Sequence, residues 1–296
     1  MISERKALIY ASLAILCWST VASAFKISLR HLDPLNLLLF SSAISTLTLF
    51  VLLMTQKKWQ TLRRLRVIEL RNAAIRGFLN PFLYYIVLFK AYTLLKAQEA
   101  GTLNYIWPIT LVLLSVPFLK QRISPWSMVA IAVSFLGIVI ISTEGRISAL
   151  EFREPVGVLL ALGSSLFWSF YWILNVKDQQ DEIVKLFLNF ATGTILVLVA
   201  VLMLSEPVWP SFEGIAGAAY IGLFEMSLAF FFWLKALKLA ENTARISNLV
   251  YISPFISLLI IRLSIGERIL VSTVVGLSLI VLGIVIQQFI HLKKKV

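Results

Sequence analysis

The sequence contains few charged residues, one cysteine and two histidines. Charged side chains make up 14% of its 296 residues, whereas apolar side chains make up 59%. The mean hydropathy is +0.89, which lies outside the range of soluble globular domains. With a single cysteine, Cys17, the chain forms no intramolecular disulfide and no cysteine metal cluster. The composition therefore predicts a membrane protein without redox chemistry.

The sequence also lacks the motifs of common enzymes. His31 and His291 lie near the ends of apolar stretches, and there is no H-E-x-x-H pattern, no pair of membrane aspartates and no phosphate-binding glycine loop. We therefore expect neither catalysis nor ATP-driven pumping by this chain, and no cofactor or metal. A membrane-embedded enzyme is the least favoured function class.

Ten apolar stretches are each long enough to cross a membrane. A helix of about twenty residues spans a hydrocarbon core roughly 30 Å thick. The stretches cover residues 7–27, 34–54, 73–95, 98–118, 125–142, 155–175, 183–204, 214–235, 243–264 and 270–290. Only short polar links separate them, so the sequence predicts an all-α polytopic membrane protein with ten transmembrane helices.

The net charge of +12 follows the predicted topology. With the N-terminus inside, seventeen basic residues lie on the cytoplasmic side: Arg5, Lys6, Lys57, Lys58, Arg63, Arg64, Arg66, Arg71, Lys120, Arg122, Lys177, Lys185, Lys235, Lys238, Lys293, Lys294 and Lys295. Eight lie opposite: Lys26, Arg30, Lys90, Lys96, Arg146, Arg153, Arg262 and Arg268. This asymmetry indicates a cytoplasmic (inner) membrane protein with both termini cytoplasmic. The basic residues are expected to contact anionic lipid, not nucleic acid.

The chain contains an internal repeat. The run LGIVI occurs at 136–140 and at 282–286, an offset of 146 that also relates KQRI at 120–123 to GERI at 266–269. Tyr105 and Pro108 correspond in the same way to Tyr251 and Pro254, while other pairs lie at offsets of 145 (Asn80 with Glu225) and 150 (Trp18-Ser19 with Trp168-Ser169). Two five-helix repeats, 1–148 and 149–296, are predicted. An odd number of helices inverts the second repeat relative to the first.

Inverted repeats build transporters whose substrate site lies near the membrane midplane and opens alternately to each side. The sequence resembles the ten-helix EamA-type exporters of the drug/metabolite transporter superfamily. The resemblance rests on Trp-Ser-Thr at 18–20, on the prolines of the fourth and ninth stretches, and on YISPFISLLIIRLSIGERI followed by GLSLIVLGIVI. Gln121 replaces a glutamate that is usual in the family. The resemblance implies export of amino acids, their derivatives or other amphiphilic metabolites.

Glu225 is the only acidic residue well inside a predicted span. A charge at the centre of a membrane helix costs about 2.5–3.5 kcal/mol, so such a residue usually faces a cavity or a partner. Three roles fit: a proton carrier, which would make protons the coupling ion, a counter-ion for a substrate amine, or a protonated structural glutamate. Its repeat partner Asn80, with Tyr84 one turn later, either faces the same cavity or satisfies backbone groups loosened by Pro81.

Aromatic residues and prolines supply the remaining candidates. Trp168 and Trp172 share one helix face, and Trp18 is the repeat counterpart of Trp168; all three fit a cavity wall for organic solutes or lipid-facing bulk. Pro108 and Pro254 break the fourth and ninth helices in mid-span, as cavity-lining interruptions or as ordinary kinks. Tyr105 and Tyr251 precede them and complete the candidate substrate site.

The sequence thus favours a secondary transporter of a small organic solute. A channel-like pore or a structural membrane subunit is the alternative, because repeats of this kind do not exclude either. Glycines offer one further expectation, since Ala130 with Gly137 and Gly276 with Gly283 place small residues seven apart. Such spacing allows close helix contact and indicates packing, not chemistry.

Overall fold

The computed structural model describes residues 2–63, 65–119, 125–146, 154–178, 180–240, 246 and 249–293, and within these ranges every regular element is helical. Five continuous spans are long and apolar enough to cross a membrane. They are α1 (Ile2–Ser28), α2 (Pro34–Thr55), α9 (Pro155–Lys177), α10 (Glu182–Leu204) and the composite of α11 (Phe212–Tyr220), η2 (Ile221–Leu228) and α12 (Ala229–Leu239).

The other predicted spans are shorter or interrupted. The third consists of α4 (Val67–Gly77), η1 (Phe78–Leu83) and α5 (Tyr84–Leu94), and the fourth of α6 (Ala97–Asn104) and α7 (Trp107–Leu119). α8 (Pro125–Ser142) is the fifth, η3 (Leu249–Ile252) with α14 (Ser253–Ile265) belongs to the ninth, and α15 (Val271–Lys293) is the tenth. A short helix, α3 (Trp59–Leu62), was not predicted.

The chain is thus an all-α polytopic membrane protein with ten transmembrane helices in two inverted repeats. Large apolar side chains on its outer surface, such as Leu47, Leu159 and Leu202, are more than half exposed. In a membrane these side chains face lipid. The start of the ninth predicted span, the KQRI segment with Gln121, and the predicted repeat boundary at 148/149 lie outside the described residues.

Local capping fixes where several spans begin. Asp33 accepts hydrogen bonds from the amides of Leu35 and Asn36 at the start of α2, and Pro34 occupies the first turn. Asp181 caps α10 and Ser211 caps α11 in the same manner. α14 ends at Gly266, whose φ of +73° is the left-handed conformation that glycine adopts without strain.

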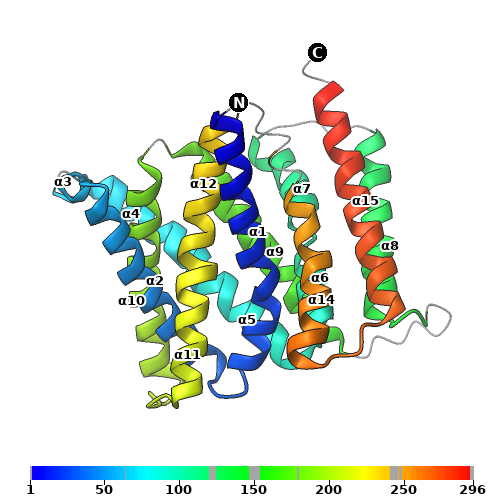
Figure 1. Ribbon diagram of the computed structural model, residues 1–296, viewed down its shortest axis with the longest axis horizontal. Helices are drawn as coiled ribbons and strands as arrows, with labels where there is room; N and C mark the ends of the chain where they lie inside the picture. The colour runs from blue at the N-terminus through cyan, green and yellow to red at the C-terminus, as the bar shows by residue number, and fades with distance from the viewer. Residues whose placement is uncertain are drawn as a thin grey trace.

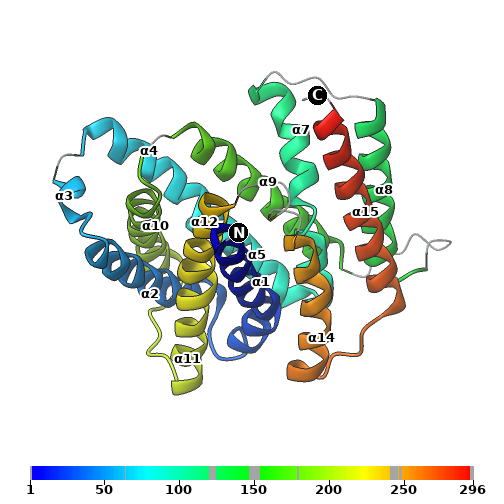
Figure 2. The ribbon, with the colours of Figure 1, turned by 45° about the horizontal axis from the view of Figure 1, so that its top comes forward.

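Figures 1 and 2 show α8 and α15 side by side on one lateral side of the bundle. α2, α4 and α10 lie on the other side, and α1, α5 and α9 lie between them. The start of α1 and the end of α15 lie at the same end of the membrane-spanning bundle (Figure 1). The twin LGIVI runs therefore belong to helices that pack against each other.

The contact between α8 and α15 is close and antiparallel. A Cβ at Gly137 would lie 2.5 Å from the Gly276 carbonyl oxygen, and one at Gly283 would lie 2.5 Å from that of Ala130. The contact partners run in opposite directions along the two helices, as expected for equivalent helices of inverted repeats. The prediction that these small residues permit close packing is confirmed.

The repeats also share their irregularities. The third and eighth spans are irregular at corresponding places: η1 is interrupted at Asn80, whose backbone is extended (φ −149°, ψ 118°), and η2 is a π-helical segment that contains Glu225. The fourth span is interrupted at Tyr105 and Ile106, and the ninth has a 3₁₀ turn at 249–252, around Tyr251. The sequence left open whether Pro108 and Pro254 interrupt their spans or kink continuous helices, and the structure has an interruption or a change of helix type just before each proline. Each is the second residue of a new helix, where a missing N–H removes no helical hydrogen bond.

One hydrogen bond is repeated as well. The Ser19 hydroxyl lies 3.2 Å from the carbonyl oxygen of Ser253, and the Ser169 hydroxyl lies 3.0 Å from that of Trp107. Ser19 and Ser169 correspond at offset 150, and Trp107 and Ser253 at offset 146. The same serine contact thus joins the first helix of each repeat to the interrupted helix of the other repeat.

Candidate functional site

A cavity of about 130 Å³ lies between the two repeats, in the middle of the bundle. The first repeat supplies lining residues from α1, α5, α6 and the start of α7, and the second supplies them from α9, η2, η3 and α14. Six predicted site residues are among them: Trp18, Tyr84, Tyr105, Trp168, Glu225 and Pro254. The irregular segments of both repeats therefore meet at this cavity.

Glu225 supplies the carboxyl group of the cavity. Its side chain is 6% exposed, and its Oε1 accepts a hydrogen bond of 3.0 Å from the Tyr85 hydroxyl. Its Oε2 is buried and has no hydrogen-bond partner within the described part of the chain. A buried polar atom without a partner is unfavourable by about 1–3 kcal/mol unless a ligand or water satisfies it. This oxygen is available to a solute in the cavity.

Aromatic rings surround that carboxyl. The Trp168 ring lies 4.8 Å from that of Tyr84 and 5.6 Å from that of Phe230, measured between centroids. The Trp18 ring meets Trp233 at 5.3 Å and Phe230 at 6.3 Å. Trp18 and Trp168 thus approach Phe230 from the two repeats. The wall they form fits the prediction of an aromatic cavity for organic solutes, and their partners show that they do not serve as lipid-facing bulk.

Neutral polar groups complete the lining. The Tyr84 hydroxyl donates to Asn104 Oδ1 at 3.2 Å, and Asn104 Nδ2 donates to Ser164 Oγ at 2.8 Å. Tyr105 donates its hydroxyl hydrogen to the Val250 carbonyl oxygen, which joins the helix break of the first repeat to that of the second. These bonds hold the lining tyrosines at fixed orientations.

Four predicted residues lie beside the cavity but not in its lining. Asn80 is fully buried in η1, and neither its Oδ1 nor its Nδ2 has a partner among the described residues. Trp172 packs against Trp168 with a centroid distance of 5.9 Å. Tyr251 lies in η3 and packs against the buried core, and Pro108 is the second residue of α7. Asn80 and Glu225 occupy equivalent positions in the two repeats, but only Glu225 lines the cavity.

Tyr85 is the neighbour of Glu225 that sequence reasoning missed. The helical spacing of four residues from Asn80 pointed to Tyr84, whereas Tyr85 is five residues from Asn80. The backbone of Asn80 is extended (φ −149°, ψ 118°), so the helix is interrupted there and the helical spacing of four residues does not continue from Asn80 into α5. Pro81 is the local signal for this interruption, because proline disfavours a helical conformation in the residue before it. The hydrogen bond from Tyr85 to Glu225 joins residues 140 positions apart, and no local pattern predicts it.

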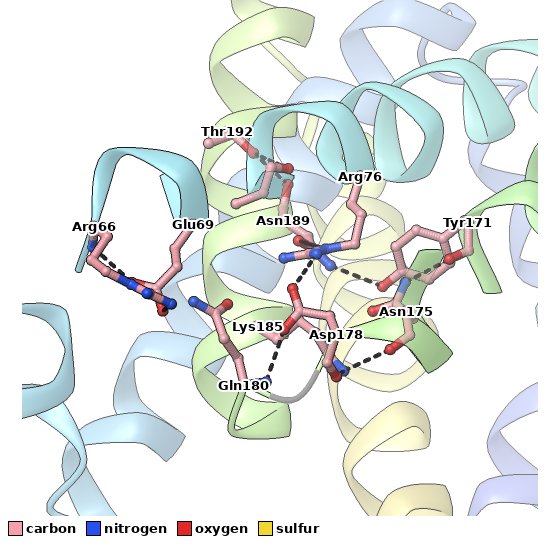
Figure 3. Close-up of polar contacts among 11 residues, drawn as sticks. Arg66, Glu69, Arg76, Tyr171, Asn175, Asp178, Gln180, Lys185, Asn189 and Thr192 are labelled. Carbon is pink, nitrogen blue, oxygen red and sulfur yellow. Dashed lines mark hydrogen bonds and ion pairs between the residues drawn. The ribbon is translucent and has the colours of Figure 1, made fainter. Parts of the chain in front are cut away.

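A second polar cluster lies where α4, α9 and α10 meet, and Figure 3 shows its side chains converging. We call Arg76, Asp178, Lys185 and Asn189 the Arg76 cluster. Arg76 is 3% exposed, forms an ion pair with Asp178, and donates from Nε to Asn189 Oδ1 at 3.0 Å. Lys185 Nζ donates to the carbonyl oxygens of Asn175 and Asp178 at 3.1 and 3.2 Å.

The Arg76 cluster is a junction between the repeats. Arg76 belongs to the first repeat and its partners to the second, and Lys185 satisfies carbonyl groups at the end of α9. Asn189 also donates to the Tyr171 hydroxyl at 3.3 Å (Figure 3). A cavity of about 570 Å³ borders the cluster and is lined by Arg66, Glu69, Asn72, Arg76, Asp178 and Gln180 among others. Its charges are of both signs.

Further ion pairs lie at the same end of the bundle. Lys58 Nζ lies 2.6 Å from Asp181 Oδ2, and Lys238 Nζ lies 2.6 Å from Glu182 Oε2. Partial burial raises the pKa of Asp181, but the Lys58 ammonium and the first amides of α10 outweigh burial and hold that pKa below its ordinary value. Asp181 thus carries a negative charge at neutral pH.

At the opposite end of the bundle, the segment Gly266-Glu267-Arg268 connects the second repeat to the first. The Glu267 carboxylate accepts hydrogen bonds from the amides of Ala97 at 2.9 Å and Gln98 at 3.3 Å, at the N-terminus of α6. The Gln98 side chain in turn bonds the Arg268 carbonyl and the Leu270 amide. These bonds connect residues 267–270 of the second repeat to Ala97 and Gln98 of the first, which also belong to the cavity lining.

The cavity has the geometry of a binding site. It offers one carboxyl oxygen, aromatic faces and neutral hydrogen-bonding groups, and no group of three or more potential metal ligands occurs among the described residues. Apolar cavities with a few polar groups between two repeats are typical of small-molecule binding sites in transporters.

Comparison with known proteins indicates a transporter. A model of the EamA-like transporter family matches residues 5–143 and again residues 155–287. An uncharacterized transporter of Clostridium kluyveri is 25% identical over 295 residues, which cover 95% of this chain and 93% of the relative. The aromatic amino acid exporter YddG of Ancylobacter novellus is 24% identical over 192 residues, 63% of this chain and 65% of that protein.

A solved crystal structure with 22% sequence identity has the same fold, with a TM-score of 0.64 over 96% of this chain and 98% of its own. The two family matches correspond to the two helical repeats of the structure. Because the family model covers most of the sequence in two copies, this chain belongs to the EamA-like transporter family.

Proposed function

We propose that the chain is a secondary transporter that exports a small organic solute, an amino acid or a related metabolite, across the cytoplasmic membrane by alternating access. The observation that carries this proposal is the mid-membrane cavity between the repeats, where Glu225 Oε2 has no partner among the described residues. The similarity to the aromatic amino acid exporter of Ancylobacter novellus supports export and solutes of the amino acid class. Catalysis is not part of the proposal.

The halves 1–148 and 149–296 act as the two moving units. They meet at the Arg76 cluster at one end of the bundle and at Glu267 with Gln98 at the other. Alternating access requires that one set of contacts opens while the other holds. Glu225 and the aromatic wall, with Tyr84 and Tyr105, bind the solute between them.

Counterflow in proteoliposomes tests transport. Vesicles preloaded with unlabelled solute should transiently accumulate labelled solute when the protein is present, and the rate should saturate. A pore gives neither saturation nor accumulation, and a structural subunit gives no flux. Either result would contradict the proposal that the protein is a carrier.

The same assay examines proton linkage through Glu225→Gln, which keeps the side-chain volume and removes titration. If Glu225 carries the coupling proton, the variant loses accumulation driven by a proton gradient yet retains exchange. If Glu225 holds the solute directly, exchange and binding weaken together. A variant that behaves as wild type in both assays leaves only the structural role.

Both termini are proposed to be cytoplasmic, which follows from the seventeen-to-eight distribution of basic residues. Gln60 in α3 then faces the cytoplasm. In a Cys17→Ala background, Gln60→Cys should resist an impermeant thiol reagent applied to intact cells and react after permeabilisation. Labelling in intact cells would reverse the topology.

A further inference from the structure

The cavity is asymmetric in charge. Glu225 is the only charged side chain in its lining among the described residues, and the other polar groups there are neutral amides and hydroxyls. A carboxylate buried among apolar groups is stable only when a cation or several hydrogen bonds compensate it. Glu225 has one hydrogen bond, from Tyr85, and an unpartnered Oε2. The missing partner is therefore a hydrogen-bond donor, and a cationic donor compensates the charge best.

Lys26 and Arg76, two half-buried or buried basic side chains of the first repeat, are engaged with other groups. Lys26 donates from Nζ to the carbonyl oxygens of Tyr92 and Leu95, at 2.7 and 2.6 Å, and so caps the end of α5. Arg76 is paired with Asp178 outside the cavity. A solute carboxylate entering the cavity would meet no cation of the lining and would lie beside Glu225. Anions and zwitterions are therefore disfavoured there.

The aromatic wall adds to this preference. Ring faces attract a cation within about 6 Å of their centroids, by about 2 kcal/mol or more when the site excludes water. Trp18, Tyr84 and Trp168 line the same cavity as the carboxyl group. An ammonium bound to Glu225 Oε2 would be held by an ion pair and by these rings together. Neither contact is available to a neutral or anionic solute.

The cavity volume limits the solute's size. A cavity of about 150 Å³ accommodates benzene in another protein. The present cavity, at about 130 Å³, has room for a solute of the size of one ring. The apolar part of such a solute would pack against Val21, Phe25 and Leu88, which also belong to the lining.

We propose that the cavity selects small organic monoamines, with an apolar body the size of one ring, over amino acids and carboxylic acids of equal size. The Glu225 carboxylate pairs with the ammonium, and the aromatic wall holds the body. This assignment rests on the proposed transport function and narrows its solute class from amino acids and related metabolites to the amines among those related metabolites. Zwitterionic amino acids, the class suggested by the name of one relative, would be the poorer substrates.

A set of matched solutes tests the assignment. Phenethylamine, phenylalanine, 3-phenylpropionate and 3-phenylpropanol share one ring and differ in charge. Their binding to purified protein is measured by the shift in melting temperature, and their transport by counterflow in proteoliposomes. We expect phenethylamine to bind at least about 10-fold more tightly than the other three, because an ion pair with hydrogen bonding contributes roughly 1.5–3 kcal/mol.

Two variants separate the carboxylate from the rest of the site. Glu225→Gln should lower the affinity for phenethylamine at least about 10-fold and leave the affinity for 3-phenylpropanol nearly unchanged, since only the ion pair is lost. The control is Glu213→Gln, the same substitution on the exposed first turn of α11. It should change the affinity for neither solute. A general loss for all solutes in Glu225→Gln would indicate a damaged fold and would overturn the assigned role.

The outcomes distinguish this inference from the transport function. If phenylalanine or 3-phenylpropionate binds and counterflows as well as phenethylamine, the amine assignment fails and transport stands. If phenethylamine binds selectively but no solute counterflows, the site assignment stands and the transport function fails. If phenethylamine fails to bind while other solutes do, the assignment is overturned.

Discussion

The Glu225 cavity and the Arg76 cluster both bury charge, but the protein compensates that charge differently in the two places. In the cluster, the Arg76 guanidinium pairs with Asp178 and Asn189, and Lys185 satisfies carbonyl groups at the end of α9, while Arg76 Nη2 alone has no partner among the described residues. In the cavity, Glu225 has one hydrogen bond and an open oxygen. Buried charges that are paired tie elements together, whereas a buried charge left open by the protein is available to a solute.

The comparison predicts that removing charge has opposite effects in the two regions. In the cluster it should destabilise the fold, because a partner charge is left buried. In the cavity it should remove binding and leave the fold intact or more stable, since no partner is orphaned. Four substitutions test this contrast, in order of decreasing effect.

Asp178→Asn should have the largest effect on stability. It leaves the guanidinium of Arg76 buried without its carboxylate, which typically lowers the free energy of unfolding by about 3–5 kcal/mol. Thermal unfolding in detergent measures the loss, with Glu182→Gln as the control because its pair with Lys238 is more exposed. Adding Arg76→Met should recover much of the loss. An unchanged melting temperature in Asp178→Asn would show that the cluster does not hold the repeats together.

Glu225→Gln should instead preserve or raise the melting temperature of the empty protein while weakening amine binding about 10-fold or more. Removing a carboxyl group with an open oxygen costs no ion pair. Unfolding and phenethylamine binding are measured on the same preparation. A destabilisation as large as that of Asp178→Asn would mean that Glu225 is structural, and the contrast between the two regions would disappear.

Tyr85→Phe should have an intermediate effect. It removes the one hydrogen bond that orients Glu225, which is equivalent to about 0.5–1.5 kcal/mol and a several-fold loss of amine affinity. Tyr220→Phe, which removes an exposed hydroxyl bonded to Thr20, is the matched control. The affinity for 3-phenylpropanol should change little in either variant. Equal losses for the amine and the alcohol would argue against positioning of the carboxylate.

Asp181→Asn should have the smallest effect, about 0.5 kcal/mol, because its pair with Lys58 is partly exposed and Asn still caps a helix. The folded-state pKa of Asp181 lies below the ordinary value, so its stabilisation is complete above that value and is lost as the pH falls through the folded pKa. Wild type should therefore approach the variant at acidic pH. A difference that grows as the pH falls would contradict this sign.

The sequence by itself determined the membrane class, the ten spans and the duplication. Long apolar stretches have few alternatives to helix in a bilayer, because every backbone group must find its partner within the segment. The repeat then aligned Asn80 with Glu225 and Tyr105 with Tyr251, and it singled out several residues that line the cavity. Composition and spacing are local properties, so they can be read without a fold.

Only the tertiary structure decided which of those residues face the cavity. The helix before Tyr85 is interrupted at Asn80, and the predicted breaks at Pro108 and Pro254 are the starts of new helices, not kinks within continuous ones. The ion pair between Arg76 and Asp178 joins residues 102 positions apart. Which buried charges are paired and which stay open depends on contacts between distant helices, and no local pattern of residues encodes those distances.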